Sequence, residues 1–369
     1  MIPVRNTLVA LLAVAALAGA EGRVVVYVSV DQEHSAVVLD AFRKETGIEV
    51  VAEYDTEATK TVGHVGRLLA ERGRPQADVF WNNEIATTVK LKRSGVLERY
   101  VSPSAADIPD EFKDADGMWT GFAARARVLI VNTDLVPEAD RPTSIWDLTK
   151  ERWRGRVGMA KPETGTTATH AACLYVKDRE MADRFFDALI GNDVVWRTGN
   201  AHVMKDVREG RLAFGLTDTD DVHVARRLGA PVAQVYPDAE PGGLGTLYLP
   251  NTVMLVKGGP NPAAGQRLVD WLLRPETERR LAEGDSAQIP VRPGVPVPPH
   301  VRRPDEVGTR FLVDFESAGS EYDRWVQHVR EKIGAGQRSA PTLFWILAGV
   351  VALGAIGFAL LKRATSEPT

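Results

Sequence analysis

The first hundred residues alternate between short apolar runs and amphipathic stretches, and this alternation constrains the fold most. A β-branched run at 24–28 is followed by a stretch at 35–45 whose apolar residues recur at helical spacing. The same order repeats at 48–54 and 62–71, and again at 77–81 and 85–93. Strands that alternate with helices in this way form parallel sheets. The sequence therefore predicts an α/β fold that begins with a parallel sheet.

A second group of elements follows and then returns to the first. Apolar runs predict strands at 128–131, 212–216 and 253–256, and helical patterns occur near 144–150, 167–177, 180–190 and 263–273. A body of roughly 300 residues exceeds what one hydrophobic core usually covers. We therefore expect two lobes joined by two crossings, with a hinged cleft between them. The expected bounds are 21–126 with 250–300 for lobe 1, and 127–249 with 301–333 for lobe 2.

Both ends of the chain carry apolar segments that predict export. Arg5, an apolar stretch at 8–18 and an Ala-x-Ala ending predict a signal peptide over residues 1–20. Residues 343–361 are apolar and uncharged, and as a helix they would span ~28 Å, enough for a bilayer core. The basic pair 362–363 places a cytoplasmic tail at 362–369. We expect a body outside the cytoplasmic membrane, anchored through linker 334–342 and a transmembrane helix.

Composition excludes several classes of function. The formal net charge is −4, which favours neither nucleic acid nor an anionic membrane surface as a partner. The single cysteine, Cys173, cannot form an internal disulfide. No Gly-x-Ser-x-Gly motif or zinc-protease motif is present, which argues against a hydrolase. We expect a binding protein rather than an enzyme, with a sensor ectodomain as a further alternative.

The acidic run 217–221, Thr-Asp-Thr-Asp-Asp, directly follows the apolar run 212–216. Ligands of open α/β sheets bind just outside the carboxyl ends of strands. Three adjacent carboxylates repel one another unless a positive group lies near them. That group is a metal ion, a cationic solute or a helix N-terminus. Under the last alternative, Thr219 or Asp218 caps a helix, and Asp220 and Asp221 lie in its first turn.

Residues for an anion lie elsewhere in the chain. The segment 164–167, Thr-Gly-Thr-Thr, opens a predicted helix, and the free N–H groups of a helix N-terminus bind anions. Arg125 and Arg127 alternate along a strand and therefore face one side, where a guanidinium can fork onto a carboxylate or phosphate. Ion pairs of these arginines with Asp78 or Asp134 are the structural alternative.

Between residues 23 and 330 the chain resembles the periplasmic substrate-binding proteins of bacterial ABC importers, and within them the ferric-ion-binding branch. The resemblance is carried by Val26-Tyr27, Phe42, Thr46-Gly47-Ile48, Ala77-Asp78-Val79-Phe80 with Glu84, Arg125-Ala126-Arg127-Val128, Thr164-Gly165-Thr166, Gly199-Asn200 and Gly210. It implies a type II periplasmic-binding-protein fold with two lobes. It also implies a small ligand, an ABC permease and an ATPase as partners, and a monomer in the periplasm.

The resemblance also implies a ligand set. Ferric-binding relatives hold Fe(III) with a histidine after the first strand, a glutamate after the third and two adjacent tyrosines, and an anion completes the shell. The matching residues here are Asp31, Glu84, Asp220 and Asp221. Fe(III) with carbonate, phosphate or citrate is then the transported ligand, without an obligatory cofactor. Because carboxylates replace three of the four residue types, an organic zwitterion such as an aminophosphonate or amino acid stays an alternative.

For either ligand, the cationic part meets the acids, and the anionic part meets residues 164–167 and Asn200, which matches a residue near the bound anion in a relative. The full expected set is Asp31, Glu84, Arg125, Arg127, Thr164, Gly165, Thr166, Thr167, Asn200, Asp218, Asp220 and Asp221.

Overall fold

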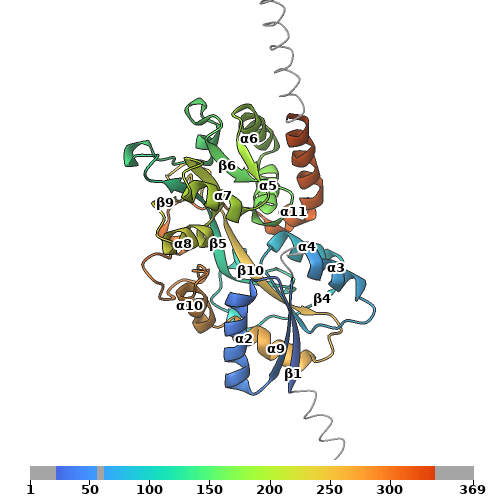
Figure 1. The fold of residues 1–369 in the computed structure, drawn as a ribbon. Coiled ribbons are helices and arrows are strands. Elements are labelled where there is room, and N and C mark those ends of the chain that lie inside the picture. The colour runs from blue at the N-terminus through green and yellow to red at the C-terminus, as the bar shows by residue number, and fades with distance from the viewer. Residues whose placement is uncertain (1–21, 56–61, 337–369) are drawn as a thin grey trace, which may run out of the picture.

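The computed structural model describes residues 22–55 and 62–336, and its centre is a long mixed sheet (Figure 1). The strand order is β2-β1-β3-β10-β5-β8-β6-β7, with β4 paired to β10 and β9 paired to β5. The strands are β1 Arg23–Val28, β2 Glu49–Tyr54, β3 Val79–Asn82, β4 Leu97–Glu98, β5 Thr120–Asn132, β6 Val157–Ala160, β7 Val195–Arg197, β8 Phe214–Asp218, β9 Val232–Val235 and β10 Tyr248–Val256.

The first half of the sheet contains the predicted parallel strands. β1 pairs in parallel with β2 and with β3, and the helices α2, α3 and α4 connect or follow these strands. Along β1, Val24 and Val26 pack into one core cluster, whereas Val25 and Tyr27 pack into the other. A strand that is apolar on both faces is buried on both faces, as parallel sheets require. These helices are α2 Gln32–Thr46, α3 Val62–Ala70 and α4 Ile85–Arg93.

Two long strands join the halves of the molecule. β10 pairs antiparallel with β3 and with β5, and β5 continues far enough to pair with β8 through its second half. The register between β5 and β10 shifts between Leu249 and Asn251. Because β5 belongs to both halves, the chain crosses between them within this strand. The predicted two-lobe α/β architecture is therefore confirmed.

The second half is built on β6, which pairs in parallel with β7 and β8. Its helices are α5 Gly165–Lys177, α6 Arg179–Gly191, α7 Asn200–Arg208 and α8 Thr219–Arg227. The remaining α-helices are α9 Pro262–Leu272, α10 Pro275–Glu283 and α11 Phe315–Ser320. Short 3-10 helices occur at Pro103–Ala105, Asp110–Phe112, Glu138–Asp140, Ile145–Thr149, Glu151–Trp153 and Pro304–Glu306.

A last helical stretch, residues 322–336, lies beside α5 and α6 (Figure 1). Its Trp325 ring stacks on Tyr175 of α5 with ring centroids 4.4 Å apart. Its Asp323 forms an ion pair with Lys90 of α4 at 2.8 Å. The C-terminal segment therefore contacts both halves of the molecule.

The expected transmembrane helix requires a correction. None of the helices within residues 22–55 and 62–336 is long and apolar enough to cross a membrane. α2, for example, has 15 residues, about 22 Å of helix against a bilayer core of ~30 Å. Its apolar side is used against the sheet. The segment 343–361 on which the prediction rested lies outside the described residues, as do the expected signal peptide 1–20 and tail 362–369.

Candidate functional site

A cavity of about 460 Å³ lies where strand ends from both lobes meet. All of the residues predicted for the site line it, except Arg127. The lobe-1 side contributes Asp31 at the N-cap of α2, Glu84 after β3 and Arg125 of β5. The lobe-2 side contributes residues 164–167, 198–202 and the acidic run. Residues that lie far apart in the sequence are thus brought into one cavity.

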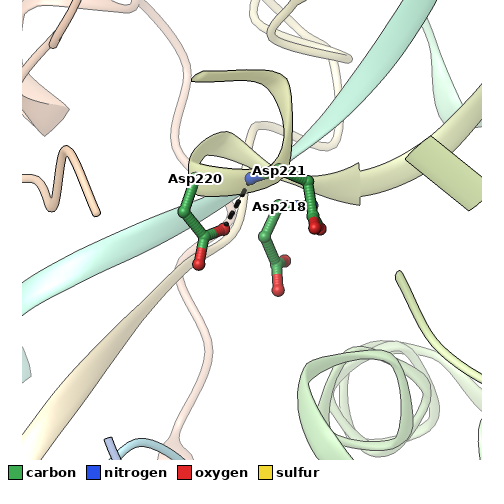
Figure 2. Close-up of side chains that lie close together, drawn as sticks. All are labelled: Asp218, Asp220 and Asp221. Atoms are coloured by element: carbon green, nitrogen blue, oxygen red, sulfur yellow. Dashed lines mark hydrogen bonds between the residues drawn. The ribbon is translucent and has the colours of Figure 1, made fainter. Parts of the chain in front are cut away.

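The acidic run forms one wall of the cavity. Figure 2 shows the side chains of Asp218, Asp220 and Asp221 on one side of the turn between β8 and α8. Each offers a carboxylate oxygen, and these oxygens lie within 4.8 Å of one another. Asp218 is the N-cap residue of α8, and its N–H donates to Asp221 Oδ2 at 3.5 Å. The run therefore begins a helix and also lines the cavity.

Asp218 is engaged within the protein. Arg127 Nη1 donates to Asp218 Oδ1 at 2.6 Å. Thr166 Oγ1 donates to Asp218 Oδ2 at 2.7 Å, and Asn200 Nδ2 donates to the same oxygen at 2.9 Å. Burial opposes ionisation, but the charges of Arg127 and Arg125 hold the pKa of Asp218 below its usual range. Its carboxylate is ionised and already satisfied.

Asp220 and Asp221 carry fewer partners. Burial raises the pKa of Asp220 to about 6, although the Arg125 charge opposes the shift. Burial also raises the pKa of Asp221 to about 8, and the neighbouring charges of Asp220 and Asp218 add to this effect. Thr217 Oγ1 donates a hydrogen bond to Asp221. At neutral pH Asp221 therefore holds its proton for most of the time, whereas Asp220 is mostly ionised, and a positive partner would favour the ionised form of both.

Arg125 lies beside this wall. Its Nη2 donates to the backbone oxygen of Asn83 at 2.5 Å. Its Nη1 is 3.9 Å from Asp218 Oδ2 and 4.0 Å from Asp220 Oδ2. The arginine therefore neutralises part of the acidic wall. The alternative partner Asp78 instead accepts from the backbone N–H of Val25 at 2.8 Å.

Glu84 is the N-cap of α4. Its carboxylate accepts from the N–H groups of Ala86 and Thr87, and from the hydroxyl of Thr169 on α5. Burial raises its pKa. Among the described residues the only cluster of carboxylates at metal-ligand spacing is Asp218, Asp220 and Asp221. The metal set with Asp31 and Glu84 stays a prediction, because Glu84 is committed to the helix and to Thr169 in this conformation.

A second wall of the cavity, which meets the acidic wall at Asp218, is formed by two helix N-termini. Thr164, the N-cap of α5, makes no side-chain capping hydrogen bond, and the N-cap of α7 is Gly199, which has no side chain. Both ends line the cavity. The first N–H groups of a helix lack intrahelical acceptors and carry the positive end of the macrodipole. This wall is suited to an anion.

The fold is shared with solved solute-binding proteins. The crystal structure of iron-bound HitA from Pseudomonas aeruginosa superposes with a TM-score of 0.73 at 23% identity, over 83% of this chain and 99% of that one. The model of the family described as bacterial extracellular solute-binding protein matches residues 38–309. The chain belongs to this family.

Relatives of this solute-binding protein differ in what their names say they bind. Iron uptake protein A2 of Synechocystis is 27% identical over 277 residues, which are 70% of this chain and 75% of the relative. A putative 2-aminoethylphosphonate-binding periplasmic protein of Salmonella typhimurium is 27% identical over 300 residues, 78% of this chain and 85% of the relative. Members of the family are solute-binding proteins rather than enzymes.

The sequence analysis missed seven residues that line the cavity of this solute-binding protein: Asn83, Ala160, Lys161, Thr198, Gly199, Ala201 and His202. Lys161 follows β6, and Thr198 and His202 flank the start of α7. β6 has four residues and includes a glycine, so no apolar run identified the strand end on which Lys161 lies. The polar helix α7 was not predicted either. These residues are recognised as part of the cavity only from the structure, which shows where β6 and α7 lie.

Proposed function

We propose that this chain is the extracytoplasmic substrate-binding component of an ABC importer. As a monomer, it closes two lobes around a small ligand and presents the closed form to a permease that works with an ATPase. The observation that carries this proposal is the cavity of about 460 Å³, which is lined from both lobes and has an acidic wall beside a wall of helix N-termini. We place the crossings between lobes within β5 and β10.

The first ligand we propose is Fe(III) with a carbonate, phosphate or citrate anion. Carboxylate oxygens suit hard cations such as Fe(III), and the oxygens of the acidic wall lie within 4.8 Å of one another. Asp220 and Asp221 would bind the ion, and the anion would lie at residues 164–167. The iron uptake relative supports this assignment. For Asp31 and Glu84 to complete the shell, Glu84 would have to release the hydroxyl of Thr169.

The second ligand we propose is an organic zwitterion such as an aminophosphonate or amino acid. The position of Arg125 favours this ligand. Its guanidinium lies about 4 Å from the carboxylates of Asp218 and Asp220 and already neutralises part of their charge, so less negative charge remains for a trivalent ion. The cavity volume is within the range of pockets that hold small organic molecules. An ammonium group would meet Asp220 and Asp221, and a phosphonate or carboxylate would meet the N-termini of α5 and α7. The aminoethylphosphonate-binding relative supports this alternative.

A thermal-shift screen of metal-stripped protein separates the two ligands. Fe(III) with each anion, divalent ions, aminophosphonates and amino acids would be compared. A ligand at 100 times its Kd adds ~2.7 kcal/mol, which raises Tm by several degrees. A shift that requires Fe(III) and an anion together supports iron, and a shift with a zwitterion alone supports the second ligand. If nothing in the screen shifts Tm, the proposed function is contradicted.

Replacing Lys161 by methionine is expected to weaken binding of the ligand found in this screen by about tenfold, equivalent to ~1.4 kcal/mol. Lys161 lines the cavity, and no ion-pair partner of its ammonium group occurs among the described residues. It is therefore available to the anionic part of a ligand. Isothermal titration calorimetry would measure the change. Lys205→Met, an exposed substitution on α7, is the matched control, and equal affinities of both variants would remove Lys161 from the site.

A further inference from the structure

A buried ion pair lies behind the anion-binding wall. Arg127 of β5 and Asp218 of β8 are direct cross-strand neighbours in the antiparallel ladder. Arg127 is 0% exposed and Asp218 is 3% exposed. Arg127 does not line the cavity, and it faces Asp218 at 2.6 Å. Arg127 is therefore part of the support of the cavity, whereas Asp218 also contributes to its wall.

The pair is surrounded by side chains from the two helices whose N-termini form the wall. Arg127 Nη1 donates to Thr166 Oγ1 at 3.2 Å, and Arg127 Nη2 donates to Thr167 Oγ1 at 3.1 Å. Asn200 Nδ2 donates to Thr166 Oγ1 and to Asp218 Oδ2, both at 2.9 Å. The first turn of α5 and the first residue of α7 are thereby tied to the sheet through one network.

The hydrogen bonds of this network occupy the hydroxyl groups of Thr166 and Thr167, which the sequence analysis assigned to an anion. The Thr166 hydroxyl accepts from Arg127 and Asn200, and its own hydrogen goes to Asp218. The Thr167 hydroxyl accepts from Arg127 and donates to Asn200 Oδ1 at 3.1 Å. A hydroxyl has one hydrogen and two lone pairs. The side chains of Thr166 and Thr167 therefore have no donor left for a ligand, and only their backbone N–H groups remain for an anion.

We propose that Arg127 and Asp218 are positioning residues: their ion pair, through Thr166, Thr167 and Asn200, aims the N-termini of α5 and α7 at one anionic group of the ligand. Asp218 is then not a ligand of the cation, in contrast to Asp220 and Asp221. This inference rests on the proposed function, in which an anionic group lies at that wall. Its chemistry is a phosphate-, phosphonate- or carboxylate-like group bound by backbone N–H groups.

The direction in which one substitution changes phosphate affinity tests this role. Removing a negative charge near an anion site normally strengthens anion binding, as we expect for Asp220→Asn. Asp218→Asn is expected to weaken binding of inorganic phosphate at least tenfold, because Arg127 loses its ionised partner and the two helix ends lose their alignment. Arg127→Gln should weaken phosphate binding to a similar extent. Phosphate affinity would be measured by NMR titration of the backbone amides of residues 165–167 and 200–202.

The double variant Arg127→Gln/Asp218→Asn is expected to recover most of the affinity lost by either single variant. Breaking one partner of a buried pair leaves an uncompensated charge, whereas removing both leaves none. A purely additive loss would overturn the positioning role. So would a gain of phosphate affinity in Asp218→Asn like that in Asp220→Asn. Failure of the wild-type protein to bind phosphate would overturn the anion site, whereas the proposed function is tested separately by the ligand screen.

An uncharged substitution covers the case in which the single charge variants do not fold. Thr167→Val removes the hydroxyl that joins Arg127 to Asn200, and it keeps both charges. We expect it to lower phosphate affinity several-fold and to speed hydrogen exchange at the start of α7. Thr167→Ser restores the hydroxyl and should restore both values. If Thr167→Val binds phosphate like the wild type, the network does not position the helix ends.

Discussion

Replacing Asp220 and Asp221 together by asparagine is expected to reduce ligand affinity at least 100-fold and to raise the Tm of the ligand-free protein. The two carboxyls line the cavity, and burial together with repulsion from neighbouring carboxylates raises their pKa values to about 6 and about 8. Such groups destabilise the folded protein when they are charged, so neutral amides relieve that cost. Because a cation gains from the same charges, their removal also removes its main attraction. Calorimetric titration and thermal melting would measure both effects.

The opposite pattern would favour a capping role. Carboxylates in the first turn of a helix contribute about 0.3–1 kcal/mol each through the macrodipole. If these residues only stabilise α8, the double variant should bind with unchanged affinity and melt at a lower temperature. A matched control is Asp305→Asn/Glu306→Gln, which neutralises two adjacent acids in the first turn of a short helix outside the cavity.

The first lobe was predictable because its elements carry strong local patterns. The run at 24–28 is apolar on both faces, and α2 buries Val38, Leu39 and Phe42 at helical spacing. The crossing strand β5 was predicted only over 128–131, although it spans Thr120–Asn132. Its first half contains glycine, alanines and an arginine, and it is buried by partners from distant parts of the chain. No local pattern reports such burial.

The second lobe was underpredicted for the same reason. β7 has three residues, and β6 contains Gly158, where an added Cβ would lie 2.5 Å from Leu212. Close approach explains the glycine in the structure, whereas in the sequence it weakens the strand pattern. α7 is largely polar and buries only Val203, Met204, Asp206 and Val207. Such elements owe their stability to tertiary packing.

The residues of the cavity were predictable from strand ends, but their roles were not. Arg125 and Arg127 are two positions apart on one strand, and the sequence gives them the same side. In the structure, Arg127 is fully buried against Asp218, whereas Arg125 lines the cavity. Arg127 lies in the part of β5 that pairs with β8, whereas Arg125 lies before this part begins. Sequence periodicity specifies the side of a strand on which a residue lies, but it does not specify which part of the strand a neighbouring strand covers.

The contribution of Asp220 and Asp221 to the stability of the ligand-free protein is expected to become more favourable, and the affinity for a cationic ligand to fall, as the pH falls from 8 to 5. The folded-state pKa values of Asp220 and Asp221, about 6 and about 8, lie above the ordinary aspartate value of 3.8. Between these values the folded state binds more protons than the unfolded state, so lower pH favours folding. The ligand requires the ionised carboxylates, and its affinity therefore rises with pH over the same interval.

Thermal melting and calorimetric titration at pH 5, 6, 7 and 8 would measure the two opposing trends. Because the Asp220 side chain is 30% exposed, solvent screens part of its shift, and most of the pH dependence should come from Asp221. Asp221→Asn should therefore flatten both profiles between pH 6 and 8. Titration in two buffers that differ in ionisation enthalpy would reveal the protons released on binding. A ligand affinity that stays constant from pH 5 to 8 would contradict direct contact between these carboxyls and a cation.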